Sequence, residues 1–386
     1  MNKLKTAILL SFICIASISS AIITPALTKI ELFYSLSHGA LEWVVSIFLL
    51  GYVIGQLIYG PIANRYGRLK ALRVGLFINL IGVLVCICST YFVSYGLLLF
   101  GRLITALGSA AGLSCTFMLL NELLSEKEAK GAMSFAIVSF TVGIGLAVTL
   151  GGMITTYLQW QYCFWLLLFH GILMYGLTYL FQETLQNPIK FNLTKVLSGY
   201  KKALSNKTLL IFSLTLGFVS AISYCYSTAA PIYAISVLKL TASSYGYWNI
   251  INMIGMFASG FISASLMNEY GPNKLLKIGF AALAPCLMSL ILIALTGASS
   301  TLWFFLTTMM LYLCGGLLFP ACSYLASNAI EDRASASSMM SFINMMTAML
   351  SVIVMGYLPF AMIISFGFIL FSLFLLTFVL SFYKSL

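Results

Sequence analysis

Charged residues are scarce in this chain. Asp, Glu, Lys and Arg together make up 8% of its 386 residues, whereas ordinary soluble domains carry about 25%. So few charges could not cover the core of a globular protein with a polar surface. Hydrophobic residues reach 61%, and the mean hydropathy is +1.04 over the whole length. The composition excludes a soluble domain with one anchor and predicts a chain that lies in the lipid bilayer.

Histidines and acidic residues are also few, at two and nine. Metal-assisted or acid–base catalysis needs clustered His, Asp or Glu side chains, and here they are scattered. The nine cysteines stand singly within apolar runs, without the spacing of Cys/His metal ligands. We therefore predict no enzyme activity, no catalytic residue, no metal site and no cofactor.

The net charge of +11 raises the question of nucleic-acid binding. However, the basic residues occur in small groups between apolar runs, as in the connectors of membrane proteins. We therefore expect the lipid bilayer, and no nucleic acid, as a partner.

Apolar runs of membrane-spanning length, roughly 20 residues, occur twelve times. The first follows Lys3 and Lys5, but it is too long for a signal peptide and lacks a convincing cleavage site, so we interpret it as a retained helix. The predicted spans are 6–27, 42–62, 73–91, 95–120, 132–155, 160–182, 209–235, 245–268, 275–297, 302–328, 336–357 and 358–382.

The basic residues favour one set of connectors. Only Lys29 and Lys239 fall in the opposite set, and Arg102 lies inside a span, so 17 of the 20 basic residues share the side of the termini. Positively charged connectors stay in the cytoplasm. The sequence therefore predicts an inner-membrane protein with both termini cytoplasmic.

A short internal repeat divides the chain into halves. Asn64-Arg65-Tyr66-Gly67, with Lys70, recurs as Asn268-Glu269-Tyr270-Gly271, with Lys274, each between the second and third span of its half. We predict an all-α membrane fold of twelve helices in two pseudo-symmetric six-helix bundles, residues 1–182 and 209–386, with a cytoplasmic central loop at 183–208. Such repeats are typical of secondary transporters.

The connector after the second span resembles the signature loop of the major facilitator superfamily, G-x-L-x-D-R-x-G-R-[RK]. It reads Gly60-Pro61-Ile62-Ala63-Asn64-Arg65-Tyr66-Gly67-Arg68-Leu69-Lys70. The resemblance implies the major facilitator fold and a gating role. The predicted gating residues are Gly60, Asn64, Arg65, Gly67, Arg68 and Lys70. Asn64 stands where the family usually has Asp, which implies a weaker charge relay.

The fourth span resembles another superfamily segment, R-x-x-Q-G/A-x-G-A-A, with Thr105 in place of Gln. Its Arg102 is a functional candidate, because a charge within a span is costly. The resemblance implies a proton-relay element or a partner for an acidic group. The alternative is a side chain that extends to the outer headgroups.

The fifth span resembles the exporter motif g-x-x-x-[GA]-P-x-x-G-G, with Val148 in place of the proline. Small residues at this spacing allow close helix packing. The predicted helix-packing residues are Gly143, Ala147, Gly151 and Gly152.

Several further stretches resemble the bicyclomycin/chloramphenicol-type resistance transporters. They are Gly55-Gln56-Leu57-Ile58-Tyr59-Gly60-Pro61, Glu183-Thr184-Leu185, Tyr226-Ser227-Thr228-Ala229-Ala230-Pro231 and the run from Tyr245 to Gly255. The resemblance implies a monomeric exporter of small amphipathic molecules, driven by protons through alternating access. It also makes Tyr226 and Asn252 candidates for the substrate cavity.

One departure concerns proton coupling. The related transporters carry an acidic residue four positions before Pro-Ala-Leu in the first span, where this chain has Ala21. The remaining titratable candidates are Glu42 and His170, each of which also fits a purely structural role. The departures leave open a transporter of a specific metabolite, such as a siderophore, amino acid or sugar. A sensor of transporter ancestry also stays open.

Overall fold

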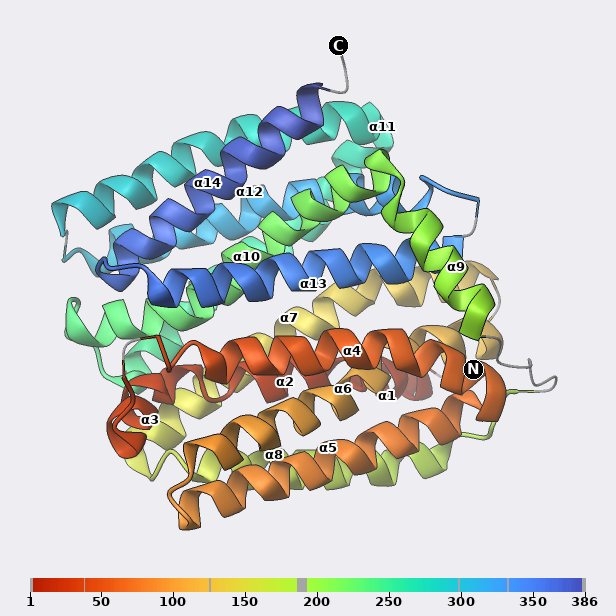
Figure 1. The fold of residues 1–386 in the computed structure, drawn as a ribbon, viewed down its shortest axis with the longest axis horizontal. Helices are drawn as coiled ribbons and strands as arrows, with labels where there is room; N and C mark the ends of the chain where they lie inside the picture. Colours follow the sequence, from red (N-terminus) through yellow and green to blue (C-terminus); the bar gives the residue numbers. More distant parts are fainter. Residues whose placement is uncertain are drawn as a thin grey trace. The chain divides into compact units, whose positions relative to one another are not determined.

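The computed structural model describes residues 3–37, 39–124, 126–185, 193–297, 299–331 and 333–383, and every regular element within these ranges is a helix (Figure 1). Twelve helical stretches are long and apolar enough to cross a membrane. This confirms the predicted all-α membrane fold. The chain divides into two compact units: unit 1 comprises Met1–Leu36 and Trp43–Phe191, and unit 2 comprises Ser37–Glu42 and Asn192–Leu386.

Unit 1 contains the first six spans. Its elements are α1 (Lys3–Ser11), α2 (Cys14–Ala21), η1 (Thr24–Ala26), α3 (Leu27–Tyr34), α4 (Trp43–Tyr66), α5 (Arg68–Tyr91), α6 (Tyr95–Leu123), α7 (Glu126–Tyr157), α8 (Tyr162–Leu177) and η2 (Thr178–Leu180). Helix α6 packs against both α4 and α5, and α2 packs against α6 and α7. Glycines such as Gly82 and Gly108 allow the close approach of α5 and α6, because a Cβ at either position would overlap the facing backbone.

The first span is interrupted, whereas the sequence predicted one helix over 6–27. Pro25 has no N–H to donate, so the regular bonding of α2 ends at Ala21. The carbonyl of Ala21 instead accepts a hydrogen bond from the Thr24 hydroxyl at 2.8 Å. The chain then continues as α3 to Tyr34, beyond the predicted end.

Unit 2 contains the other six spans. Its helices are α9 (Leu193–Leu204), α10 (Lys207–Ser236), α11 (Ala242–Thr296), α12 (Thr301–Ser327), α13 (Arg333–Tyr357) and α14 (Met362–Tyr383). Helix α10 packs against α12, α13 and α14, and α11 packs along α12. Helix α11 holds two spans, which meet at Gly271.

The segment predicted as a central loop, 183–208, contains the helix α9. Its residue Ala203 belongs to an apolar cluster with Leu209 and with Met339 of α13, so α9 is part of unit 2 (Figure 1). Residues 186–192 lie outside the described residues. The segment is therefore not loop throughout, because an apolar face of α9 has a packing partner.

The internal repeat is visible in the backbone. Gly67 lies between α4 and α5 with φ 120°, and Gly271 lies at the corresponding place within α11 with φ 71°. Residues with a Cβ rarely adopt such angles. Both halves therefore turn from their second to their third span through a glycine.

Candidate functional site

A single carboxylate caps the start of α5. The N–H of Arg68 donates to Oε1 of Glu183 at 2.8 Å, and those of Leu69 and Lys70 donate to Oε2 at 3.2 Å each. The capping depends on Gly67, because a Cβ there would overlap this carboxylate. Backbone donors at a helix start form an anion site, which here is filled by a residue that follows η2.

The electrostatics of Glu183 follow from these contacts. Partial burial alone would raise the pKa of its carboxyl, but the hydrogen bonds from the backbone N–H groups of Lys70, Leu185, Arg68 and Thr184 outweigh it. The pKa of Glu183 therefore lies below its ordinary value. The positive end of the α5 dipole acts in the same direction. Glu183 is consequently an anion at neutral pH.

Arg68 connects this cap to two other helices. Its Nε donates to Oε1 of Glu122, near the end of α6, at 2.8 Å, and Nη2 forms an ion pair with the same oxygen at 2.8 Å. Its Nη1 donates to the carbonyl of Ala63, in the last turn of α4, at 2.9 Å. Thr184 also donates to Oε2 of Glu122. We call Arg68, Glu122, Glu183 and Thr184 the charge cluster.

The side chains of the other predicted gating residues do not join the charge cluster. The side chain of Asn64 makes no hydrogen bond to a described residue. Arg65 is exposed and lies over the ring of Tyr66, with the guanidinium carbon 5.1 Å from the ring centre. The side chain of Lys70 is exposed, and Gly60 faces the end of Met118. The structure thus brings Gly67 and Arg68 to the cluster, whereas Lys70 reaches it only through its backbone N–H.

Sequence reasoning did not assign a role to Glu122 or Glu183. The available signal was the Glu183-Thr184-Leu185 stretch, together with the absence of an acidic residue in the first turn of α5. Arg73 was also missed. Its Nε donates to the Thr178 hydroxyl at 3.0 Å and its guanidinium lies 4.5 Å from the centre of the Tyr179 ring, which ties α5 to η2.

Arg102 lies in the interior of unit 1 with 1% of its surface exposed. Its Nη1 donates to the carbonyl of Ser19 at 2.5 Å, and its Nε lies 3.3 Å from the carbonyl of Val44. The guanidinium carbon is 4.3 Å from the centre of the Phe48 ring. The predicted alternative, a side chain that reaches the outer headgroups, is wrong, because this guanidinium is enclosed among α2, α4 and α6.

The two other coupling candidates differ in their surroundings. Glu42 is 2% exposed and belongs to unit 2, where its side chain fills the space beside Gly356 of α13. The imidazole of His170, in α8, is partly buried and makes no hydrogen bond to a described residue. Glu42 is therefore packed against α13.

The small residues of α7 face α2. A Cβ at Gly143 would overlap the hydroxyl of Ser17, and one at Gly151 would overlap the carbonyl oxygen of Ile22. Ala147 and Gly152 are buried along the same helix. At Gly143 and Gly151, α7 therefore lies close to the first span.

The two cavity candidates belong to one buried network in unit 2. The Tyr226 hydroxyl donates to Oδ1 of Asn249 at 3.0 Å and accepts from Nδ2 of Asn252 at 2.6 Å. The Thr308 hydroxyl donates to Oδ1 of Asn252 at 2.9 Å, which links α10, α11 and α12. Tyr226 and Asn252 are 3% and 2% exposed. In this structure their polar groups bind one another.

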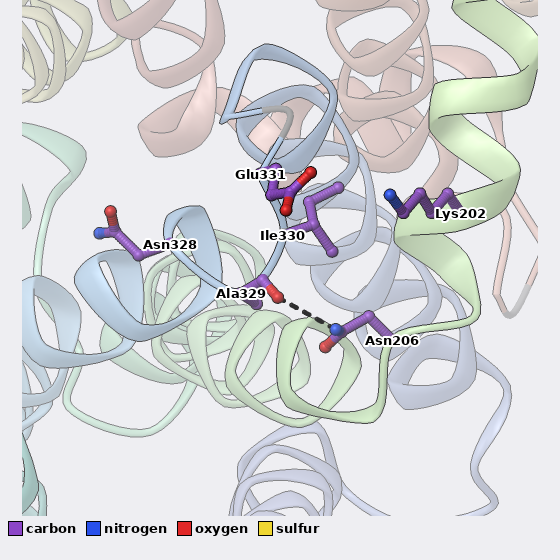
Figure 2. A pocket seen from close by; sticks show the side chains of 6 residues that line it. All are labelled: Lys202, Asn206, Asn328, Ala329, Ile330 and Glu331. Atoms are coloured by element: carbon purple, nitrogen blue, oxygen red, sulfur yellow. Dashed lines mark hydrogen bonds between the residues drawn. The ribbon is translucent and has the colours of Figure 1, made fainter.

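A cavity of about 590 Å³ opens elsewhere in unit 2. It lies between α9, the start of α10 and the connection from α12 to α13, and Figure 2 shows the amino group of Lys202 directed toward Glu331 across it. Asn206 lines the cavity, and its side-chain amide donates to the carbonyl of Ala329 at 3.1 Å (Figure 2). None of the sequence-predicted site residues lines this cavity.

Comparisons with known proteins agree with this architecture. The bicyclomycin resistance protein homolog of Haemophilus influenzae is 23% identical over 274 residues, which cover 70% of this chain and 68% of the relative. Multidrug resistance protein D of Escherichia coli is 24% identical over 263 residues, covering 64% of this chain and 65% of the relative. The matched stretch thus spans about two thirds of each relative.

Solved structures show the same fold. A D-xylose-proton symporter superposes with a TM-score of 0.80 at 16% identity, covering 97% of this chain and 96% of the symporter. A bacterial homologue of the human lysosomal transporter Spinster gives a TM-score of 0.70 at 16% identity, with coverages of 98% and 95%. The family model described as Major Facilitator Superfamily matches residues 9–354. This multi-pass membrane protein therefore belongs to the Major Facilitator Superfamily, a family of transporters.

Proposed function

We propose that this chain is a proton-coupled exporter of small amphipathic molecules that works by alternating access. The observation that carries the proposal is its similarity to two drug-resistance proteins over about two thirds of their length. Neither relative exceeds 24% identity, so the substrate is proposed by class only. We further propose that it acts as a monomer in the inner membrane with both termini in the cytoplasm.

The charge cluster supports a mechanical role for the start of α5. Arg68, Glu122 and Glu183 hold the ends of α4, α5 and α6 and the segment after η2 together. An alternating-access cycle moves bundles largely as rigid bodies, and such a cluster keeps one end of unit 1 rigid. In this proposal Gly67 and Arg68 stabilise one gated state.

Glu42 is the coupling group that we favour, because it is a buried carboxyl group. A buried carboxyl group is favoured in its neutral form, and a hydrated one in its ionised form. A group that alternates between these surroundings takes up and releases a proton. The packing of Glu42 beside Gly356 supplies the buried surroundings. Arg102 and His170 remain further coupling candidates in the proposal.

The alternative is a transporter of a specific metabolite, such as a siderophore, amino acid or sugar. Ala21 favours it, because the drug exporters that the first span resembles carry an acidic residue there. In purified proteoliposomes, substrate-driven proton flux would distinguish the two functions by its direction.

Compound accumulation in cells tests the proposal. Expression should lower the accumulation of at least one member of a fluorescent panel with cationic, neutral and anionic compounds, and a protonophore should abolish the effect. Glu42→Gln should remove at least about 90% of the proton-driven component, since an amide cannot release a proton. Glu31→Gln removes a carboxylate elsewhere and should keep the wild-type rate. Unchanged accumulation across the whole panel would refute export.

A further inference from the structure

Arg102 has more donor capacity than its contacts use. A guanidinium carries five N–H donors and no acceptor, yet its two hydrogen bonds go to the carbonyls of Ser19 and Val44. Its Nη2 is buried and has no hydrogen-bond partner among the described residues. A buried donor without a partner is costly and rare in native proteins. The atom therefore marks a place where a ligand with acceptor oxygens would be stabilised.

No described acidic side chain forms an ion pair with Arg102 in unit 1. Arginine stays protonated in proteins, and this one is 1% exposed. Among the described residues the one ion pair is that of Arg68 with Glu122, in the charge cluster. Two carbonyl dipoles and the Phe48 ring stabilise the cation in part, but a buried charge is normally paired with an opposite one.

The structural contacts of Arg102 do not account for Nη2. Nη1 binds a carbonyl in the last turn of α2, where the last four carbonyls of a helix lack regular partners. Nε reaches the first turn of α4. These two atoms tie α2 and α4 to α6, and that tie is complete without Nη2.

We propose that Nη2 of Arg102 binds the carboxylate of the transported substrate, so that the preferred ligand is an amphipathic organic anion. Guanidinium groups bind carboxylates strongly because the N–H fork matches the two oxygens. The substrate then supplies the negative charge that Ala21 does not. The inference rests on the proposed transport function, because Nη2 is sealed here and an anion reaches it only in another state of the cycle.

Two probes with the same apolar body test the charge preference. Binding of naphthoate and of naphthamide to the purified full chain in lipid nanodiscs is measured by the change in Tm and by titration. Naphthoate should bind at least about tenfold more tightly than naphthamide, as expected for one charge-assisted hydrogen bond. Equal affinities, or no binding of naphthoate, would overturn the inference with no variant needed.

Variants locate the anion. Arg102→Gln should remove the preference and Arg102→Lys should keep part of it, while Lys239→Gln, which removes an exposed cation in unit 2, should leave it unchanged. If Arg102→Gln does not fold, Ala21→Asp provides a second test, because it adds a carboxylate two residues from Ser19 in α2. That internal anion should weaken naphthoate binding and spare naphthamide. A preference that persists in Arg102→Gln, or naphthoate binding unaffected by Ala21→Asp, would contradict the assignment.

The result can be separated from the fate of the exporter proposal. A chain that exports panel compounds but binds both probes equally keeps the proposed function and loses the anion site. A chain that prefers naphthoate through Arg102 but lowers no accumulation keeps the anion site and loses the export function.

Discussion

Glu183 accepts hydrogen bonds from three consecutive backbone N–H groups at the start of α5. A helix start leaves four such groups without partners, so one side chain satisfies most of them. It does so from a distant part of the chain, after η2. At the scale of single residues, this carboxylate links the start of α5 to the segment that follows η2.

The depressed pKa of Glu183 predicts a pH-dependent contribution to stability. Its carboxyl binds a proton more weakly in the folded protein than in the unfolded chain, so the contribution is complete above the ordinary value of 4.5 and is lost as the pH falls below it. Glu183→Gln should lose about 1 kcal/mol of stability at neutral pH. Its Tm deficit in detergent should shrink as the pH falls below 4.5.

Glu31→Gln serves as the matched control, because it removes a carboxylate of α3 that is far from the charge cluster in sequence. Its Tm should follow the wild type at every pH. A Tm deficit of Glu183→Gln that is the same at neutral and acidic pH would show that the negative charge is not what stabilises the cap.

The helix junctions of the two units differ in one respect. Gly67 and Gly271 both have positive φ, in a region that is essentially confined to glycine. A Cβ at Gly67 would overlap the carboxylate of Glu183, whereas one at Gly271 would meet nothing within 4 Å. The same turn is therefore filled by a carboxylate in unit 1 and left open in unit 2.

Alanine at each junction separates backbone strain from the loss of the cap. Gly271→Ala should cost about 1–3 kcal/mol from strain alone. Gly67→Ala should cost about 1 kcal/mol more, because it also displaces Glu183 from the N-terminus of α5. The measurement is the Tm of each purified variant.

A double-mutant cycle checks the cause of the difference. In a Glu183→Ala background, the extra cost of Gly67→Ala should vanish, because contacting residues are coupled and the contact is then absent. If the two glycine variants lose the same stability in both backgrounds, the overlap with Glu183 has no energetic consequence.

For the whole molecule, the distribution of charge decides the orientation. Twelve helical stretches can span a membrane, and an even number returns the chain to the side on which it began. Of 20 basic residues, 17 fall on the side of the termini, and basic connectors are retained in the cytoplasm. We therefore expect the charge cluster to face the cytoplasm.

Reporter fusions test this orientation. Alkaline phosphatase fused after Leu36, between the first two spans, should be active because it is exported. The same reporter fused after Gly67, between the next two, should have about the activity of a cytoplasmic control. Activity after Gly67 would place the charge cluster outside and reverse the proposed direction of gating.

Much of the fold could be predicted from the sequence, whereas the candidate site could be predicted only in part. Apolar runs determine where a chain crosses a bilayer, because only apolar side chains are stable in the hydrocarbon core. The core holds no water, so the backbone N–H and C=O groups of such a run must bond to one another within a helix. Arg102 stood out because a charge in a span is conspicuous. Glu122 and Glu183 did not, because a carboxylate near the end of a span resembles any hydrated residue until the groups that it binds are known.

The sequence alone determined the class, the twelve crossings and the repeat, since each depends on local composition and on spacing along the chain. Only the tertiary structure decided which polar groups meet. It paired Glu183 with the start of α5, enclosed Arg102 among three helices with Nη2 unpaired among the described residues, and joined Tyr226 to Asn252. These contacts depend on the approach of segments that are distant in the sequence. A hydrogen bond forms only when donor and acceptor lie about 3 Å apart, and spacing along the chain does not show which distant groups come that close.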